Sequence, residues 1–573
     1  MTPSTFHYLA SRVLARLALA LALAVGLLGG LSSGASATAG RLAAGMAPRT
    51  DGTTVVYQTS GQSGDNDVAA ATLVGRTQFP VAIGDSQAML PDIDGGVAVW
   101  QETNGNGDFD VRAKRLDGTG QAFAVAASDR NEVYPAIFGD FVAYVSAPAG
   151  NSAGATQTLE VRNIATMADP ITLDQAPVGG GGGGFLHPVI NGKRLAWVRL
   201  AQIGPHVVHW QLKTQLLGEP TATTVAEEDL DIGGPMGALS TPSFDLSGNI
   251  LVYSADLHLT AVDLMTNVRT EIAVPEGNDF RPAQNPTVDG RYVFWQDYRT
   301  SGEPTNLVSQ LQNGTLTADI TGYDLLTGSE FPVVVAAGYN TAPAARGGAL
   351  VYEHQPKSGS GSPEVYTLPI NDVLPSAPRP DNGDPNRSYY AATGHALSGA
   401  FREFWQQSGG LPVFAYPMTD VFTEHGFVAQ YLERQRFEAH PEFDGTPYMV
   451  ELGLLGAEDA QHHGIATSAP FMPVSAASNG NCQFFAATGH RLCNGFKAYW
   501  QSHGLEFGDP GVSYRESLAL FGYPISEEYV DPTTGLVTQY FERAVFEYHP
   551  NNPDPYKVLL RRLGADLLTQ RGW

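Results

Sequence analysis

Two phrases near the C-terminus place a glutamate and a histidine two residues apart: YLERQRFEAHP at 431–441 and YFERAVFEYHP at 540–550. Side chains at this spacing on a strand point the same way, so Glu547 and His549 could hold a metal ion or form an acid/base pair, as could their counterparts in the first phrase. No third ligand follows at a fixed spacing, and Arg543 would share their face and oppose a cation. Because Arg, Glu and His pairs are common structural contacts across hairpins, we favour a structural role and assign neither a metal ion nor a catalytic residue.

Hydrolase motifs are missing from the chain beyond residue 39. It has no Gly-x-Ser-x-Gly, the turn that presents the serine of α/β-hydrolases, and no His-Glu-x-x-His. The Ser-x-Asp-x-Gly-x-Thr-Trp boxes of sialidases are also missing. Glycosidases that work with carboxylates from separate strands leave no such motif, so that class stays open.

The elements that would position any such groups follow a repeat in the first two thirds of the chain. A proline is followed nine residues later by an aromatic residue in six copies and eleven residues later in one. The seven pairs are Pro48–Tyr57, Pro91–Trp100, Pro135–Tyr144, Pro188–Trp197, Pro242–Tyr253, Pro286–Trp295 and Pro343–Tyr352. Asp-Gly or Asn-Gly turns between apolar segments predict a hairpin in each copy, and a third strand often follows.

Four-stranded units repeated every 43 to 57 residues predict a mainly β fold, a seven-bladed β-propeller over 45–371. The chain enters near the start of a blade, so either terminus could supply the last strand. FWQDYR, YDLLTG and the Pro-x-x-x-Gly hairpins resemble the TolB-type propeller repeats of exported bacterial proteins. This resemblance implies a fold and not an activity.

Ligand binding is expected on the long, variable segments that follow the aromatic residues. In a propeller these second-to-third-strand loops share a face with the channel mouth, and function concentrates on loops. The candidate ligand-binding residues are Glu102, Asp297, Arg299 and Glu353. They could also be ordinary polar groups of solvated loops. NGNGDFD (104–110) is rich in oxygen ligands suited to Ca²⁺ but lacks a twelve-residue loop with a closing glutamate, so no ion is assigned to Asp108 and Asp110.

A second repeat begins after a Pro-, Asp- and Asn-rich segment (374–388) that is typical of an interdomain linker. ATGHALSGAFREFWQQSGGL (392–411) returns as ATGHRLCNGFKAYWQSHGL (487–505), and each copy continues through FAYP or FGYP to one of the Glu-x-His phrases. Apolar residues at i, i+4, i+7 and i+8 predict one amphipathic helix per copy, and each Glu-x-His phrase is predicted to be one strand. We therefore expect a tandem of small α+β modules.

The order of tryptophan helix, Gly-Gly, FGYP and QYFER resembles the LGFP-type repeats of exported, cell-wall-associated bacterial proteins over 389–573. This resemblance implies binding to envelope or wall glycan, with exposed aromatic rings stacked on sugars. Trp405 and Trp500 fit the apolar face of their helices better and are not assigned as ligand contacts.

The first 39 residues predict a secretory signal peptide: Arg12 and Arg16 precede the apolar run Leu17–Leu28, and small residues follow. This run of 12 residues is shorter than the roughly 20 of a membrane span, and no later span is predicted. The expected organisation is a signal peptide 1–39, a β-propeller 45–371, a linker 372–388, a first α+β module 389–460, a linker 461–481 and a second α+β module 482–573.

Charge and cysteine content limit the partners and the compartment. The net charge of −25 becomes −27 once a segment with two arginines and no acid is removed, which disfavours nucleic acid and anionic lipid as partners. Export places Cys482 and Cys493 in an oxidising compartment, where they are predicted to form a disulfide that closes a short loop.

These patterns predict an exported protein that is secreted or held at the cell surface. It would bind a partner or ligand rather than catalyse a reaction, and no cofactor is expected. The propeller would take a partner or ligand, and the two C-terminal modules would attach the protein to envelope or wall glycan or to a surface protein. The alternative is a secreted glycoside hydrolase or lyase whose active site lies at the channel mouth of the propeller.

Overall fold

The computed structural model describes residues 40–573 except 62–63, 85, 106, 119, 150–154, 178–183, 232–241, 274–281, 300–306, 308, 311–312, 336, 357, 359–360 and 476–479. The predicted signal peptide therefore lies outside the described residues. The chain forms two compact units, one running to Leu326 and including Pro332–Val373, the other comprising Thr327–Phe331 and Leu374–Trp573. None of the described helices is long and apolar enough to cross a membrane.

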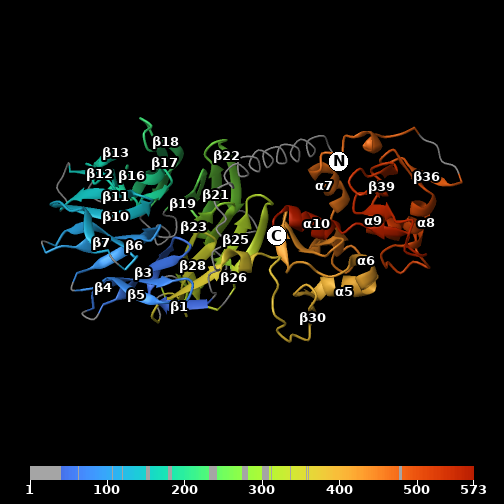
Figure 1. Cartoon of the computed structure of the whole chain (residues 1–573), viewed down its shortest axis with the longest axis horizontal. Helices are drawn as coiled ribbons and strands as arrows, with labels where there is room; N and C mark the ends of the chain where they lie inside the picture. Colours follow the sequence, from blue (N-terminus) through green and yellow to red (C-terminus); the bar gives the residue numbers. More distant parts are fainter. Residues whose placement is uncertain are drawn as a thin grey trace. The chain divides into compact units, whose positions relative to one another are not determined.

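The N-terminal unit is built from antiparallel sheets that follow one another along the chain (Figure 1). The first three sheets consist of β2 (Met46–Thr50), β3 (Thr54–Ser60), β4 (Asn66–Thr72) and β5 (Gln78–Ala82); β6 (Ala88–Asp94), β7 (Val97–Thr103), β8 (Phe109–Arg115) and β9 (Phe123–Ala126); and β10 (Arg130–Phe138), β11 (Phe141–Pro148), β12 (Thr156–Asn163) and β13 (Ile171–Pro177). In the fourth, β14 (Gly184–Phe185) and β15 (Val189–Asn191) both pair with β16 (Arg194–Gln202), which is followed by β17 (Val207–Leu216) and β18 (Thr223–Asp231).

Three more sheets complete the unit, which makes seven among the residues of this unit that the structure describes. They consist of β19 (Ser243–Ser247), β20 (Ile250–Ala255), β21 (His258–Asp263) and β22 (Val268–Ala273); β23 (Ala283–Asp289), β24 (Tyr292–Asp297), β25 (Asp319–Asp324) and β26 (Ser329–Val334); and β27 (Tyr339–Arg346), β28 (Ala349–Gln355), β29 (Glu364–Pro369) and β1 (Gly40–Ala44). The strand nearest the N-terminus in the described chain thus completes the last sheet. A short helix, α4 (Ile370–Val373), follows.

The sequence repeat occupies equivalent places in all seven sheets. Each repeated proline lies in or directly before the first strand, or before β15 in the fourth sheet, and each repeated aromatic residue lies on the strand that follows it. Six of the seven aromatic residues are buried, and Tyr253 is half-buried. The alternation of apolar residues and the Asp-Gly turns therefore produced the predicted mainly β fold.

Neighbouring sheets share their cores, and the last sheet packs against the first. Leu42, Val55 and Val351 belong to one buried cluster that joins the seventh sheet to the first. At the same seam, a Cβ on Gly52 would lie 2.9 Å from the Cα of Gly347, so the two turns touch through glycine backbones. A buried apolar contact and a contact between two turns thus join the seventh sheet to the first.

Asp-Gly turns also connect some neighbouring sheets. Asp94 Oδ2 accepts the N–H of Gly139 at 2.7 Å in the following turn, and Asp289 Oδ2 accepts the N–H of Gly348 at 2.7 Å. A hydrogen bond of a backbone amide to a carboxylate is stronger than one between neutral groups. The turn residues therefore hold neighbouring sheets in register as well as closing hairpins.

In the C-terminal unit one order of elements occurs twice. The first copy contains β30 (Arg387–Tyr390), β31 (His395–Ser398), α5 (Gly399–Gln407), α6 (Gly410–Phe414), β32 (Phe422–Glu424), β33 (Phe427–Tyr431), β34 (Arg436–Ala439), β35 (Val450–Leu452) and α7 (Leu455–His462). The second contains β36 (Cys482–Phe485), β37 (His490–Cys493), α8 (Asn494–Ser502), α9 (Tyr514–Phe521), β38 (Tyr529–Val530), β39 (Val537–Tyr540), β40 (Val545–Tyr548), β41 (Val558–Leu560) and α10 (Leu563–Gln570). One buried cluster contains residues of both copies, so they share a core.

The prediction that each Glu-x-His phrase is a single strand is wrong. Tyr431 ends β33 and Tyr540 ends β39, and the next strand begins only five residues later in each copy. The N–H of Leu432 donates to Gln435 O at 2.7 Å, and the N–H of Phe541 donates to Ala544 O at 2.8 Å. Each phrase is therefore a hairpin whose tight turn carries a buried apolar residue.

The last helix of each copy packs on the hairpin turn of the other copy. The N–H of Ala457 in α7 donates to Glu542 O at 3.1 Å, and the N–H of Ala565 in α10 donates to Glu433 O at 3.1 Å. A glycine precedes each alanine because the helix touches the turn: a Cβ on Gly564 would lie 1.9 Å from Leu432 O. The two copies are interlocked by this reciprocal contact.

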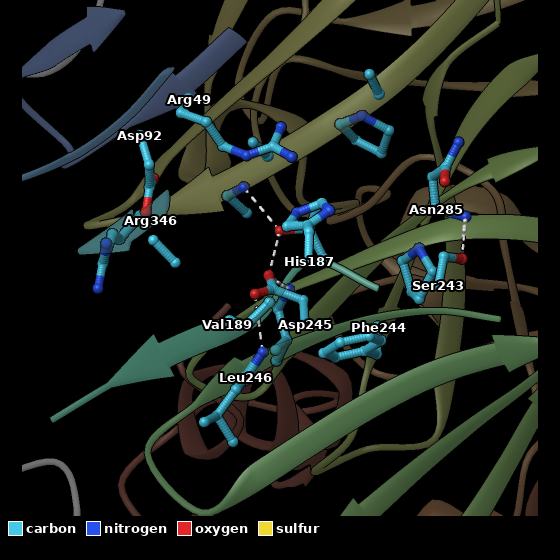
Figure 2. Close-up of a pocket in the computed structure, with 18 of the residues that line it drawn as sticks. Arg49, Asp92, His187, Val189, Ser243, Phe244, Asp245, Leu246, Asn285 and Arg346 are labelled. Atoms are coloured by element: carbon cyan, nitrogen blue, oxygen red, sulfur yellow. Dashed lines mark hydrogen bonds between the residues drawn. The ribbon is translucent and has the colours of Figure 1, made fainter. Parts of the chain in front are cut away.

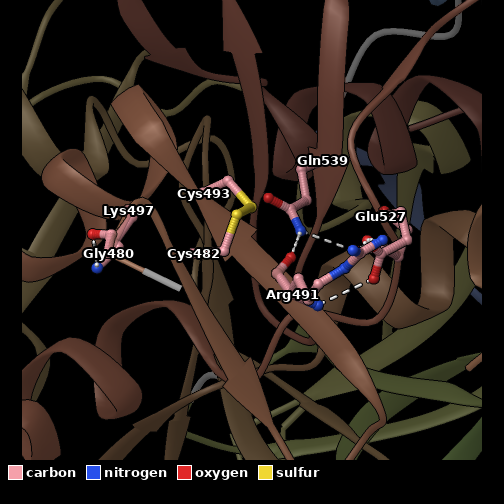
Figure 3. Close-up of a disulfide and its surroundings, with 8 residues drawn as sticks. Gly480, Cys482, Arg491, Cys493, Lys497, Glu527 and Gln539 are labelled. Carbon is pink, nitrogen blue, oxygen red and sulfur yellow. Dashed lines mark hydrogen bonds and ion pairs between the residues drawn. A yellow bond between two sulfur atoms is a disulfide. The ribbon is translucent and has the colours of Figure 1, made fainter. Parts of the chain in front are cut away.

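The predicted disulfide between Cys482 and Cys493 is confirmed. The two cysteines face each other across β36 and β37 (Figure 3). Arg387 and Ser398 are paired at the same place in the first copy. The hairpin is also held by Gln539, whose Nε2 donates to Arg491 O at 2.7 Å. The bridge thus reinforces a contact that the first copy makes without it.

Candidate functional site

The N-terminal unit contains a cavity of about 610 Å³ (Figure 2). Residues from the first strand, or from β15 in the fourth sheet, line it in all seven sheets. Six of the seven repeated prolines are in the lining: Pro91, Pro135, Pro188, Pro242, Pro286 and Pro343. The repeat that sets the fold therefore also sets the wall of the cavity.

The residues that precede five of the seven repeated prolines have an unusual backbone. Ala47, Leu90, Tyr134, Asn285 and Ala342 have φ between 48° and 57°, and all five line the cavity. In each case the pairing of the first and second strands is interrupted by a bulge at this point. A residue other than glycine with such a φ costs roughly 1–2 kcal/mol, and such strain is typical of functional sites.

Arg49 supplies a positive charge to the cavity. It follows Pro48 on β2, and its guanidinium extends into the cavity toward His187 (Figure 2). Its Nη1 donates to Pro48 O at 3.0 Å, and among the described residues no carboxylate forms an ion pair with it within 4.0 Å. Arg346, which also lines the cavity, is paired with Asp94 at 3.4 Å.

The aspartates of the cavity wall are engaged by the neighbouring sheet. Asp92 Oδ2 accepts the N–H of Ile137 at 2.8 Å. Asp245 Oδ2 accepts the Thr287 hydroxyl at 2.7 Å and the N–H of Val288 at 3.0 Å. Burial raises the pKa of both aspartates, and these hydrogen bonds and the charge of Arg49 oppose the rise. Their oxygens serve the contact between sheets, which leaves Arg49 available for a ligand.

His187 and Tyr134 form an aromatic wall. Their ring centroids lie 6.2 Å apart with an interplanar angle of 25°. The surrounding protein, with a smaller contribution from the charge of Arg49, lowers the pKa of His187 to about 4 by desolvating the imidazole, although part of the residue is exposed to the cavity solvent. The imidazole is therefore neutral near pH 7 and presents a flat surface beside a guanidinium.

The cavity can bind an anion that carries an apolar body. Leu90, Phe244 and Leu186 add apolar surface, and the guanidinium offers paired donors with the geometry of a carboxylate. In the part of the chain that the structure describes, no group of three or more His, Cys, Asp and Glu residues could hold a metal ion.

The four ligand-binding residues predicted from sequence lie outside the lining of this cavity. Glu102 accepts hydrogen bonds from the Ser86 hydroxyl and from Trp100 Nε1, both at 2.8 Å. The other three also have partners within the protein: Asp297 binds Arg299 and Thr321, and Glu353 accepts the N–H of Ala47 and the amide of Gln355. The structure does not gather them, and their role in binding stays a prediction.

The Glu-x-His residues take part in ion pairs of the C-terminal unit. Glu547 Oε1 accepts from Arg561 Nε at 2.8 Å, and His549 lies 3.4 Å from Glu547. In the first copy Glu438 accepts from Arg436. These contacts anchor the hairpin of each copy.

No family model and no curated protein matches the chain. Solved structures similar to it include the β-propeller domain of the Trilobed protease from Pyrococcus furiosus (12% identity, 57% of this chain and 96% of that one, TM-score 0.40). The acylaminoacyl peptidase of Pyrococcus horikoshii matches at 11% identity over 70% of this chain and 59% of that one, with a TM-score of 0.40. A putative TolB from Agrobacterium tumefaciens matches at 13% identity over 44% of this chain and 81% of that one, with a TM-score of 0.29.

These structures contradict the function predicted from sequence. They include an acylaminoacyl peptidase and puromycin hydrolases, whereas the sequence predicted a binding protein attached to glycan, or a glycoside hydrolase or lyase. The chain spans about three fifths of the length of these peptidases. Glycan-directed functions are therefore withdrawn.

The functional residues that the sequence analysis missed are Arg49, His187 and Tyr134. Arg49 follows a repeated proline, and His187 and Tyr134 each precede one. The signal was therefore position within the repeat and not residue type.

Proposed function

We propose that the N-terminal unit is a closed seven-bladed β-propeller related to those of peptidases, and that its cavity receives the C-terminal carboxylate of a peptide. The observation that carries this proposal is Arg49, a cavity guanidinium without an ion-pair partner among the described residues. The cavity volume of about 610 Å³ suits a ligand of a few residues.

The walls agree with a peptide end that has an apolar side chain. A carboxylate would accept two hydrogen bonds from Arg49, and an apolar or aromatic side chain would pack on Tyr134 and His187. Because the pKa of His187 is lowered to about 4, its ring stays neutral and the binding should not change between about pH 6 and 8.

We also infer that the protein is exported and that its two C-terminal copies are LGFP-like modules. Residues 1–39 have the composition of a signal peptide, and the disulfide Cys482–Cys493 suits an oxidising compartment.

Calorimetric titration of the full chain with short peptides tests the cavity. An N-acetylated tripeptide with a C-terminal phenylalanine and a free carboxylate is expected to bind, and the same peptide with a C-terminal amide is not. A hydrogen-bonded charge pair contributes about 1.5–3 kcal/mol, so Arg49→Gln should weaken binding by roughly 10- to 150-fold. Arg115→Gln, an exposed arginine, is the matched control. Equal affinity of the acid and the amide would contradict the proposal.

A further inference from the structure

The loops that join the second and third strands of the first two sheets are built alike. The N–H of Gly61 donates to Asp65 O at 2.8 Å, and the N–H of Asn104 donates to Asp108 O at 2.9 Å. The residue after each of these aspartates donates its N–H to a side-chain amide oxygen near the start of the next sheet. Asn66 donates to Gln87 Oε1 at 3.2 Å, and Phe109 donates to Asn131 Oδ1 at 3.0 Å. The shared sequence pattern is Gly-Asp-x-Asp, at 64–67 and 107–110.

The first loop contains a buried carboxylate without a partner. Asp65 is 7% exposed, and neither of its side-chain oxygens has a hydrogen-bond partner. No lysine or arginine of the described chain forms an ion pair with it within 4.0 Å. A buried charge without a partner is strongly unfavourable, so a cation bound at these oxygens would stabilise the folded chain.

A second carboxylate converges on the same place. A Cβ on Gly61 would lie 2.2 Å from Asp65 Oδ1 and 3.1 Å from Asp67 Oδ2. The two oxygens thus approach one point, and glycine at 61 leaves the space for them. Asp67 has one partner through its other oxygen, which accepts the N–H of Gly84 at 3.3 Å. Two carboxylates this close repel each other unless a cation lies between them.

We propose that Asp65 and Asp67 bind a divalent cation, and that the cation is Ca²⁺. The donors are carboxylate oxygens of Asp65 and Asp67, with water to complete the coordination, and such hard ligands suit Ca²⁺. Ca²⁺ also accepts irregular coordination by six to eight oxygens including water, whereas Mg²⁺ requires a near-octahedral set. No histidine or cysteine lies in the pattern, which argues against zinc. This site is separate from the cavity and does not depend on the peptide proposal.

The second loop is a weaker version of the same site. Asn104 stands where the first loop has Gly61, and its Nδ2 donates to Asp110 Oδ1 at 3.1 Å. Asp108 is 8% exposed, and its Oδ1 has no partner. One of the two carboxylates of this loop is thus already stabilised by the protein, so the first loop is expected to bind the ion more tightly.

The test compares the full chain with Asp65→Asn before and after Ca²⁺ is added to protein freed of metal with a chelator. Asp169→Asn is the matched control, because Asp169 is exposed and the same charge is removed. Without Ca²⁺ we expect Asp65→Asn to melt at the same temperature as the wild type or higher, since a buried repulsive charge is gone. With Ca²⁺ the wild type and Asp169→Asn should melt several degrees higher, and Asp65→Asn should not.

Calorimetric titration with CaCl₂ should show one dominant site, with a Kd of roughly 10⁻⁵ to 10⁻³ M, that is lost in Asp65→Asn and kept in Asp169→Asn. Mg²⁺ at the same concentration should raise the melting temperature less. A wild type that does not respond to Ca²⁺, or an Asp65→Asn variant that responds as the wild type does, overturns the site. An equal response to Mg²⁺ overturns the choice of ion.

Discussion

Substituting alanine for Gly564 should destabilise the C-terminal unit, although alanine favours helices. Gly564 is the second residue of α10, and its notional Cβ lies 1.9 Å from Leu432 O in the other copy. The equivalent Gly456 in α7 has the same relation to Phe541 O, at 2.0 Å. Because the opposing atom is a backbone carbonyl in a buried turn, it cannot rotate away as a side chain would.

The structure sets the size of the effect. Forcing an extra carbon into a packed contact costs about 1–3 kcal/mol, and the shift also weakens the hydrogen bond from Ala565 to Glu433, worth about 1 kcal/mol. Replacing glycine by alanine in a helix increases the free energy of unfolding by roughly 0.5–1 kcal/mol. The expected net loss is about 2 kcal/mol for Gly564→Ala.

Gly495 provides the control because it is also the second residue of a helix, α8, and a Cβ there would meet nothing within 4 Å. Gly495→Ala should therefore stabilise the unit slightly. Hydrogen exchange read by mass spectrometry on peptides from α10 and β33 measures the free energy of opening in this unit alone. If Gly564→Ala protects these amides as well as Gly495→Ala does, the reciprocal packing of the helices is refuted.

Three further predictions concern charges and the disulfide of this unit. Arg436→Met should cost about 3–5 kcal/mol in urea unfolding because three carboxylates lose a buried partner, whereas Arg515→Met, at an exposed pair, should change the free energy of unfolding far less. Burial acts to raise the pKa of Glu424, but Arg571 and Arg436 outweigh it and lower the pKa, so this stabilisation is complete above the ordinary value of 4.5 and is lost as the pH falls below it. The melting temperature of the wild type should therefore fall more steeply on acidification than that of Glu424→Gln. Reducing the bridge Cys482–Cys493, which spans 11 residues, should cost about 3 kcal/mol, measured as a lower melting temperature that a double Cys→Ser variant reproduces without reductant.

The positions of the strands were predictable because the repeat is periodic. A proline and an aromatic residue at a fixed interval sit on successive strands of each sheet, so a count along the sequence was sufficient. The same sequence could not show that the Asp of a turn such as Asp94 accepts a hydrogen bond from Gly139 of the next turn. That contact depends on how two sheets are placed, which periodicity does not specify.

The Glu-x-His phrases were misinterpreted for a local reason. Alternating polar and apolar letters fit one strand, but Leu432 and Phe541 are fully buried at a turn, where a strand would have continued. The role of the glycines in LLGAE and RLGAD was equally hidden. Gly456 and Gly564 leave room for the backbone of the other copy. A local sequence pattern cannot predict a contact with residues so distant in the chain.

The cavity shows why residue type alone did not reveal the site. Nothing in the composition distinguishes Arg49 from the other lysines and arginines, which number 33 in all. The acidic loop residues seemed better candidates for a binding site because they cluster in the sequence. In a fold made of equivalent sheets, the first strands line the centre, so the position beside each repeated proline was the informative one. The four predicted loop residues were chosen by their type and lie elsewhere.

The residue before each repeated proline decides what the cavity can bind. The backbone is nearly the same at five of these places, so the fold itself does not require a particular side chain there. A positive φ favours glycine, yet Ala47, Leu90, Tyr134, Asn285 and Ala342 occupy it at a conformational cost. Their side chains give the cavity its apolar, aromatic and amide surfaces around Arg49. The selectivity of the cavity therefore follows from the few places where the seven sheets differ and not from the repeat that they share.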